Sequence, residues 1–261
     1  GLLIGTPFIG LNILNGGQFL LLFSFLFQIV STYFIFKIKT KSVGESSLDE
    51  DIFSSIFKGI KYIYTNGLIF LIILTVAFHC AFVMSYESIM PIFANEGLND
   101  NTGKFLGYLI MMFGAGSIVG NLMLSNANNN SIKSKYFVIS AFGSGIFPMM
   151  LSFAGFLNGD LVITISLSII FLIGACQSSF MSLTTTMIQK VVPDGIRGRI
   201  MSLYLLHAGG IMAFGNLILG NMADIYGYAW LFRLTGIAFL IYILFVLSTQ
   251  RRFKADIIAI L

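Results

Sequence analysis

Three ionisable side chains, His79, Glu87 and His207, lie inside long apolar stretches of the sequence. An ionisable group within a membrane span is costly, so each is a hypothesis for a functional position. His79 lies about 18 Å along a helix that starts at Gly67, near the middle of a bilayer. It is predicted either to line a cavity, where it would bind substrate or carry a proton, or to pack as a neutral imidazole satisfied by a neighbouring helix.

The face of His79 carries two more polar residues if the helix is regular. Thr75 and Tyr86 fall on that face by helical spacing. Glu87 lies farther out, about 30 Å from Gly67, where it would meet interfacial water. If a cavity opens there, Glu87 would instead attract cationic substrates or exchange a proton. His207 lies close to the start of its apolar stretch, which favours an interfacial or packing role.

A second polar face is predicted around Gln177. Gln177, Met181 and Thr184 share one face by helical spacing. A threonine hydroxyl can bond its own helix backbone, whereas Gln177 needs a partner or a cavity. The predicted substrate or ion pathway therefore consists of Thr75, His79, Tyr86, Glu87, Gln177 and Thr184.

A short polar segment between two apolar stretches carries Pro193, Asp194, Arg197, Gly198 and Arg199. Its arginines would set the topology and contact lipid phosphate. Alternatively they form a latch, in which guanidinium groups pair with helix C-terminal carbonyls or acids in one conformation and release them in the other. The predicted role is structural or gating rather than contact with substrate.

Motifs for covalent or cofactor chemistry are missing from the sequence. It has no P-loop, no nucleophile elbow, no HExxH and no metal-ligand spacing. Cys80 and Cys176 lie in apolar stretches and are expected to be buried, unreactive thiols. We therefore expect no catalytic residue, no metal, no cofactor and no enzyme activity.

The composition is that of a membrane protein. Of 261 residues, 57% are hydrophobic and 10% are charged, and the mean hydropathy is +0.91. Soluble domains are about 25% charged, so a soluble fold could not cover its surface with so few polar side chains. The 27 phenylalanines suit contact with acyl chains, and the 27 glycines suit close helix packing.

Apolar stretches of about 20 residues are long enough to cross a bilayer as helices. The chain also begins with Gly in an apolar piece, 1–14, that is too short to span. This is expected if upstream helices are missing. Seven full spans are predicted, at 16–38, 67–94, 103–125, 135–157, 161–189, 200–223 and 227–249.

The gap at 39–66 is long and amphipathic. Apolar residues recur in it at helical spacing, from Ile52 and Phe53 to Ile63 and Tyr64, which indicates a helix on the membrane surface or packed on the bundle. The predicted domains are the end of an N-terminal bundle (1–38), a linker (39–66), a six-helix bundle (67–249) and a tail (250–261).

Basic residues are distributed unequally between the two sides of this arrangement. If successive spans cross the membrane in alternating directions, 13 of the 15 Lys and Arg lie on one side and only Lys104 and Arg233 lie on the other. Cytoplasmic loops carry such an excess, so the linker, the 126–135 and 190–199 loops and the C-terminus are predicted to be cytoplasmic. The net charge of +4 is thereby explained without nucleic acid.

Two spans contain a related heptapeptide. Gly120 begins Gly-Asn-Leu-Met-Leu-Ser-Asn, and Gly215 begins Gly-Asn-Leu-Ile-Leu-Gly-Asn. Counted from residue 67, they lie in the second helices of two successive triplets, and transporters are often built from such inverted repeats. Gly116 pairs with Gly120 for close helix contact, and Gly220 follows Gly215; these four are predicted packing positions, static or sliding.

The chain resembles the major facilitator superfamily, and within it the subgroup of the enterobactin exporter and the macrolide-efflux proteins. The clearest likeness is the segment from Gln189 to Tyr204, which is similar to Q-x-x-V-P-D-x-x-R-G-R-V-M-S-L-Y. Weaker likenesses lie at 5–10 (G-P-x-x-G), at 57–63 (x-x-G-I-R-Y-V), and at Tyr86 with Pro91. The resemblance implies a truncated all-α bundle holding part of helix five and helices six to twelve.

The function expected from this resemblance is secondary active transport by alternating access. It implies export of a small lipophilic or siderophore-like molecule through the plasma membrane, by proton antiport. The expected partners are that substrate, membrane lipid and the missing N-terminal helices. The open alternatives are a non-transporting scaffold or receptor and an inactive transporter fragment.

Overall fold

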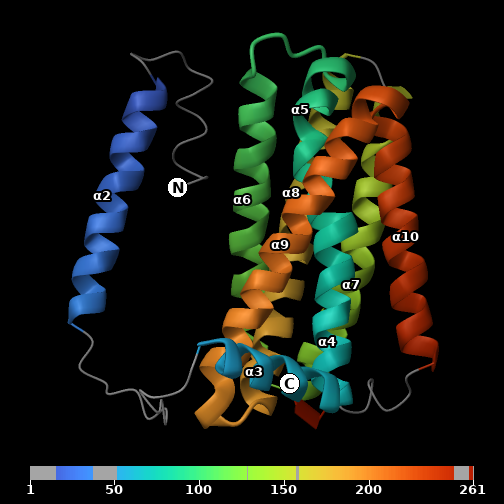
Figure 1. Ribbon diagram of the computed structural model, residues 1–261. Coiled ribbons are helices and arrows are strands. Elements are labelled where there is room, and N and C mark those ends of the chain that lie inside the picture. The colour runs from blue at the N-terminus through green and yellow to red at the C-terminus, as the bar shows by residue number, and fades with distance from the viewer. Residues whose placement is uncertain (1–15, 38–51, 128, 157–158, 250–258, 261) are drawn as a thin grey trace.

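A computed structural model describes residues 16–37, 52–127, 129–156, 159–249 and 259–260, and its described elements are all helical (Figure 1). The glycine motif at 5–10, the 39–51 segment and the tail residues 250–258 lie outside the described residues. The α-helices are α2 (Gly16–Phe36), α3 (Ile52–Thr65), α4 (Gly67–Phe78), α5 (Met90–Ile92), α6 (Lys104–Ser125), α7 (Asn130–Leu151), α8 (Asp160–Val191), α9 (Asp194–Tyr226) and α10 (Tyr228–Thr249).

Five helical segments of the described chain are long and apolar enough to cross a membrane. They match five of the seven predicted spans, and the spans predicted at 16–38 and 135–157, which correspond to α2 and α7, stay predictions. In Figure 1 α2 stands apart from the other helices, and its described side chains from Phe25 onward are exposed. The five segments are Gly67–Gly97, Lys104–Ser125, Leu161–Val191, Asp194–Tyr226 and Tyr228–Thr249.

The bundle has two apolar cores, one towards each end. The core at the end covered by α3 contains Ile63, Phe137 and Met187, and we call this end the α3 end. The core at the opposite, α5 end contains Phe93 and Leu151. Between the two cores the helices carry small and polar residues, which we call the central belt: Ser85, Gly116, Ser117, Gly120, Asn121, Gly143, Ser144, Gly145, Gly174, Gln177, Ser178, Gly215, Asn216, Thr235 and Gly236.

The predicted packing glycines differ in how closely they approach other helices. A Cβ on Gly116 or Gly120 of α6 would collide with the backbone of α8 at Phe171 and Ala175. Gly215 of α9 is equally tight, because a Cβ there would collide with Ser85 Oγ. Such close approach replaces the hydrophobic driving force that is missing between helices in lipid.

Gly220 has more room than the other three. A Cβ there would lie 3.8 Å from Ser88 Cβ, which is ordinary contact. The two heptapeptides therefore act alike through their first glycines: α6 packs on α8, and α9 packs on the segment that follows α4. Each is the second helix of its triplet and contacts the first helix of the other triplet.

The span that begins with α4 is not a regular helix. His79–Val83 forms a π-helical turn, Met84–Ser88 a 3₁₀ turn, and Phe93–Gly97 a second π turn after α5. Ser85 stabilises the break, because its hydroxyl donates to the Cys80 carbonyl at 2.9 Å and lies 3.4 Å from the Met212 carbonyl of α9. Turns of this kind are found at functional sites and re-aim the residues that follow them.

α9 begins earlier than the sequence suggested. The polar segment at 190–199 was expected to be a loop, but Asp194 to Arg199 form the first turns of α9. Only Val192 and Pro193 separate α8 from α9 in extended backbone. Proline is well suited to a helix start, and Asp194 in the first turn complements the helix dipole.

Charged residues are segregated between the two ends of the described bundle. α6 and α10 start at the α5 end, with Lys104 at the first position of α6 and Arg233 in the second turn of α10. The helix ends and linker of the opposite, α3 end carry Lys58, Lys61, Lys133, Lys135, Lys190, Arg197 and Arg199.

Candidate functional site

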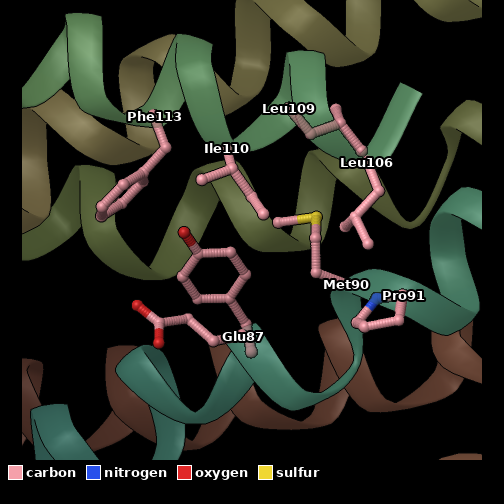
Figure 2. Close-up of a pocket in the computed structure, with 8 residues that line it drawn as sticks. Glu87, Met90, Pro91, Leu106, Leu109, Ile110 and Phe113 are labelled. Atoms are coloured by element: carbon pink, nitrogen blue, oxygen red, sulfur yellow. The ribbon is translucent and has the colours of Figure 1, made fainter. Parts of the chain in front are cut away.

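A cavity of about 290 Å³ lies between α6 and the irregular part of the preceding span (Figure 2). The irregular part contributes Tyr86, Glu87, Met90 and Pro91. These residues follow the π and 3₁₀ turns, so the break in the helix positions them. The facing wall comes from α6 and consists of Leu106, Leu109, Ile110 and Phe113.

The cavity is apolar except for the Glu87 carboxylate and the Tyr86 hydroxyl. Tyr86 is fully buried, and its ring centroid lies 6.1 Å from that of Phe113. Glu87 is exposed, and Figure 2 shows it on the wall opposite Phe113. No Lys or Arg in the described part of the chain forms an ion pair with Glu87. The cavity thus offers one uncompensated negative charge within an aromatic and aliphatic lining.

His79 lies outside this cavity, in the interior of the bundle. Its side chain is fully buried, its ring stacks on Phe180 of α8 at 4.4 Å, and it meets Phe239 of α10 edge-on at 5.3 Å. Neither ring nitrogen has a hydrogen-bond partner. Of the two alternatives for His79, lining a cavity or packing against other helices, the structure shows packing. The polar partner on a neighbouring helix that the packing alternative assumed is not present among the described residues.

Gln177 is buried in the same way. It is 1% exposed, and neither its side-chain oxygen nor its nitrogen has a partner. It lies one turn before Phe180 on α8, at the level of the central belt. Ser144 of α7, in the belt as well, also has a buried hydroxyl without a partner. Unpaired polar groups cost most where water is absent, so these side chains are the bundle's strongest internal candidates for contact with a ligand or water.

Thr75 and Thr184 are satisfied by hydrogen bonds. The Thr75 hydroxyl donates to the Leu71 carbonyl at 2.7 Å and lies 3.1 Å from the Tyr242 hydroxyl of α10. Thr184 is bonded to the backbone of its own helix and lies 3.5 Å from the Tyr204 hydroxyl of α9. These contacts connect helices and leave neither hydroxyl available.

The structure thus brings together only two of the six predicted pathway residues in one cavity. The expectation that Thr75, His79 and Tyr86 share a face fails, because the π turn at His79–Val83 changes the rotation between them. Thr75 and His79 face α8 and α10, whereas Tyr86 faces α6. The α6 wall was missed because apolar residues there resemble any lipid-facing helix; no signal in the sequence distinguishes them.

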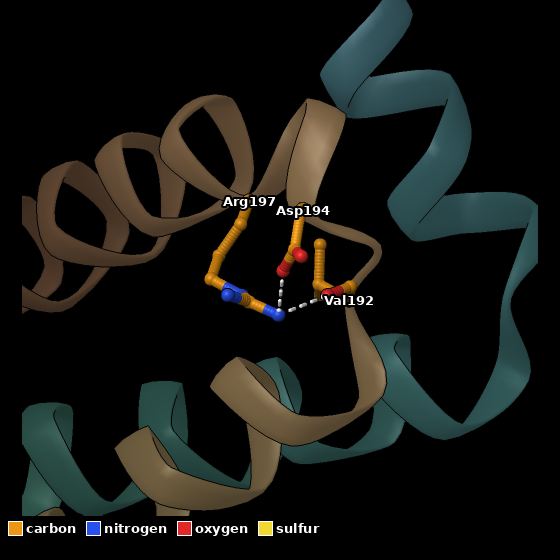
Figure 3. A network of polar contacts seen from close by, with 3 residues as sticks. All are labelled: Val192, Asp194 and Arg197. Atoms are coloured by element: carbon orange, nitrogen blue, oxygen red, sulfur yellow. Dashed lines mark hydrogen bonds and ion pairs between the residues drawn. The ribbon is translucent and has the colours of Figure 1, made fainter. Parts of the chain in front are cut away.

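The predicted latch segment has a defined geometry (Figure 3). Arg197 pairs with Asp194 and donates to the Val192 carbonyl, the C-cap of α8, at 3.2 Å. This is the arrangement that the latch hypothesis requires in one of its two conformations. Gly198 has open space around it, and Pro193 caps α9. Release in a second conformation stays a prediction.

A comparison with protein families gives a match that covers most of the chain. The family described as transmembrane secretion effector matches residues 11–259. No curated protein and no solved structure matches the chain.

Proposed function

The chain belongs to the transmembrane secretion effector family of the major facilitator superfamily, and from this premise we propose that it moves lipophilic cations across a membrane by alternating access. Family membership supports a multi-pass membrane protein with a transport role. The observation that supports lipophilic cations as the substrate is the cavity with Glu87 at its wall.

The lining of this cavity favours a cation with an apolar body. Aromatic and aliphatic side chains such as Phe113 and Leu109 offer contact area to a hydrophobic ligand. Glu87 adds a carboxylate with no cation of the described chain to neutralise it. A bound organic cation would supply that charge, and the apolar lining would strengthen the attraction by lowering the local dielectric constant.

The central belt supplies the polar positions between the two ends of the bundle. Transporters bind substrate and coupling ion near the midplane, at the interface of their repeats. The unpaired side chains of Gln177 and Ser144 lie at this depth, and the unpaired imidazole of His79 packs on Phe180 and Phe239 of the adjoining α3-end core. We propose that they contact the substrate or a proton when the cavity opens towards the α3 end.

The proposed direction is export through the plasma membrane, with the C-terminus and the α3 end in the cytoplasm. The concentration of Lys and Arg at the α3 end supports this orientation. The word secretion in the family description supports outward movement. Proton entry is the proposed driving force, with Glu87 or His79 as the carrier.

The variant Glu87→Gln tests the cation site. Tetraphenylphosphonium and tetraphenylborate have nearly the same shape and opposite charge, so their binding to the purified protein isolates the electrostatic contribution. Glu87→Gln is expected to weaken tetraphenylphosphonium binding by about tenfold or more and to leave tetraphenylborate binding unchanged. Glu96→Gln, an exposed acid outside the cavity, is the matched control.

Ethidium efflux from proteoliposomes tests transport itself. Uptake or release should depend on an imposed proton gradient, should stop with an uncoupler and should fall with Glu87→Gln. If Glu87→Gln weakened the binding of tetraphenylphosphonium and tetraphenylborate equally, this result would contradict the cation site. Absence of any flux, with assembly that depends on a partner, would favour a scaffold instead.

A further inference from the structure

A second cavity, of about 430 Å³, opens at the α3 end between α3, α4 and α9. Its floor includes Ile63 of α3 and Ile73 of α4, both buried. Tyr64, Phe70 and Leu206 at its rim are exposed, and His207 of α9 lines it. We call it the α3 groove. Neither the proposed substrate cavity nor the latch shares a residue with it.

α3 presents three different faces, and this arrangement defines the surroundings of the groove. One face packs on the bundle: Gly59 is buried, and a Cβ there would lie 2.7 Å from Leu203 of α9. A second face is apolar but exposed, from Phe53 at 79% to Tyr64 at 71%. The third face carries the exposed Lys61. A helix with adjacent apolar and basic faces is suited to the boundary between acyl chains and lipid headgroups.

The position of α3 places the groove at this boundary. α3 lies across the ends of α4 and α9, at the end of the bundle where the described Lys and Arg gather (Figure 1). Basic clusters beside membrane spans attract anionic lipids. The groove interior is apolar, so it suits an acyl chain, while Lys61, which follows the lining residue Ile60 in α3, suits a phosphate.

A polar group in the lining of the groove favours a ligand that has polar atoms as well as an apolar chain. The Nε2 atom of His207 is buried and has no hydrogen-bond partner. A hydrocarbon chain alone could not pair with this nitrogen, whereas the ester or hydroxyl oxygens of a glycerolipid can pair with it once the imidazole turns towards the groove. A protein partner that covered the groove would also have to neutralise the lysine face of α3.

We propose that the α3 groove is a binding site for one anionic phospholipid, with an acyl chain between α3, α4 and α9 and the phosphate beside Lys61. A bound lipid would fasten α3 to both α4 and α9. These helices belong to different triplets of the bundle, so the lipid would join the linker to both halves of the repeat. This proposal does not depend on the transported substrate.

Photo-crosslinking of the purified full-length chain tests the site. The probe is phosphatidylglycerol with a diazirine in one acyl chain, and crosslinked peptides are located by mass spectrometry. The expected result is enrichment in the peptides around residues 60–74 and 203–207 over the remaining lipid-facing surface. Leu206→Trp is expected to remove this enrichment by filling the groove. Leu206 is 72% exposed, so the substitution leaves the packed core intact.

Competition experiments test the headgroup. Unlabelled phosphatidylglycerol should compete better than phosphatidylcholine, and Lys61→Gln should reduce this preference by about fivefold. Lys104→Gln, at the opposite end of the bundle, should leave it unchanged. The proposal would be overturned by uniform labelling of the lipid-facing surface or by equal competition from both lipids. It would also be overturned if the groove peptides were crosslinked to a second copy of the chain instead of to lipid.

Discussion

Asp100 fixes the turn that leads into α6, the helix that forms one wall of the proposed substrate cavity. Its carboxylate accepts hydrogen bonds from Thr102, through the backbone and the hydroxyl, and from the backbone of Lys104, Phe105 and Leu106. These amides start a helix and have no partner within it. Asp100→Ala is therefore expected to destabilise the protein by about 1–2 kcal/mol, measured by thermal unfolding in detergent.

The contribution of Asp100 should depend on pH. Partial burial raises the pKa of its carboxyl, but the hydrogen bonds from Leu106, Thr102 and Phe105 lower it more, so the pKa lies below its ordinary value. A lowered pKa stabilises the folded state above the ordinary Asp value of about 3.9, and this stabilisation is lost as the pH falls through the lowered value. The stability difference from Asp100→Asn should therefore shrink on acidification below about pH 4. A difference that stays constant would contradict this account.

Residue type alone could predict part of the candidate site. An acid and a histidine in apolar sequence are conspicuous, so both were predicted as pathway residues; the structure brings Glu87 into the cavity and leaves His79 outside it. Their surroundings were not predictable. Glu87 lines a cavity and His79 lies between Phe180 and Phe239, because the π turn between them shifts the helix face. A π turn has no residue signature comparable to the proline of a kink.

Among the elements, long apolar stretches were the most predictable. Predicted spans at 103–125 and 227–249 agree with α6 and α10 to within one residue at each end. The start of α9 was less predictable, since polar residues at 194–199 favour a loop by composition but form a helix after Pro193. α3 packs against α9 near this start, with Gly59 against Leu203.

The contact between α6 and α8 gives a prediction at the scale of elements. A Cβ on Gly120 would collide with the backbone of Ala175, and Ser117 donates across the same contact to the Gly174 carbonyl at 3.2 Å. Backbone cannot yield as a flexible side chain does. Gly120→Ala is therefore expected to force the helices apart and to lower stability by about 1–3 kcal/mol, measured by thermal unfolding in detergent.

A second glycine supplies the control for this contact. Gly209 of α9 has no atom within 4 Å of the position that a Cβ would occupy. Gly209→Ala should therefore leave stability unchanged or raise it by up to about 1 kcal/mol, through the higher helix propensity of alanine. If Gly120→Ala and Gly209→Ala lowered the thermal stability equally, backbone flexibility rather than helix contact would explain the role of Gly120.

At the scale of the whole molecule, the two packing contacts and the two cores form one pattern. α6 of the first triplet packs on α8 of the second, and α9 of the second packs on the span that starts the first. Each contact passes through the central belt, where small residues replace large ones. The belt thus holds both the closest helix contacts and the unpaired polar atoms of Gln177 and Asn216. A shift between the triplets would therefore change the surroundings of those atoms.

The orientation of the whole bundle in the membrane gives a further prediction. Basic residues concentrated at the α3 end predict that this end is cytoplasmic. The test uses a background with Cys80→Ala and Cys176→Ala and adds Asn101→Cys, just before α6, or Ser131→Cys, in the first turn of α7. Both positions are exposed, and α6 lies between them. A membrane-impermeant maleimide should label Asn101→Cys in intact cells, and Ser131→Cys only after permeabilisation. Labelling of both from outside would place the two ends on one side, which a single crossing by α6 forbids. The reverse pattern would keep the crossing but invert the proposed orientation, and with it the assignment of the α3 groove to the cytoplasmic leaflet.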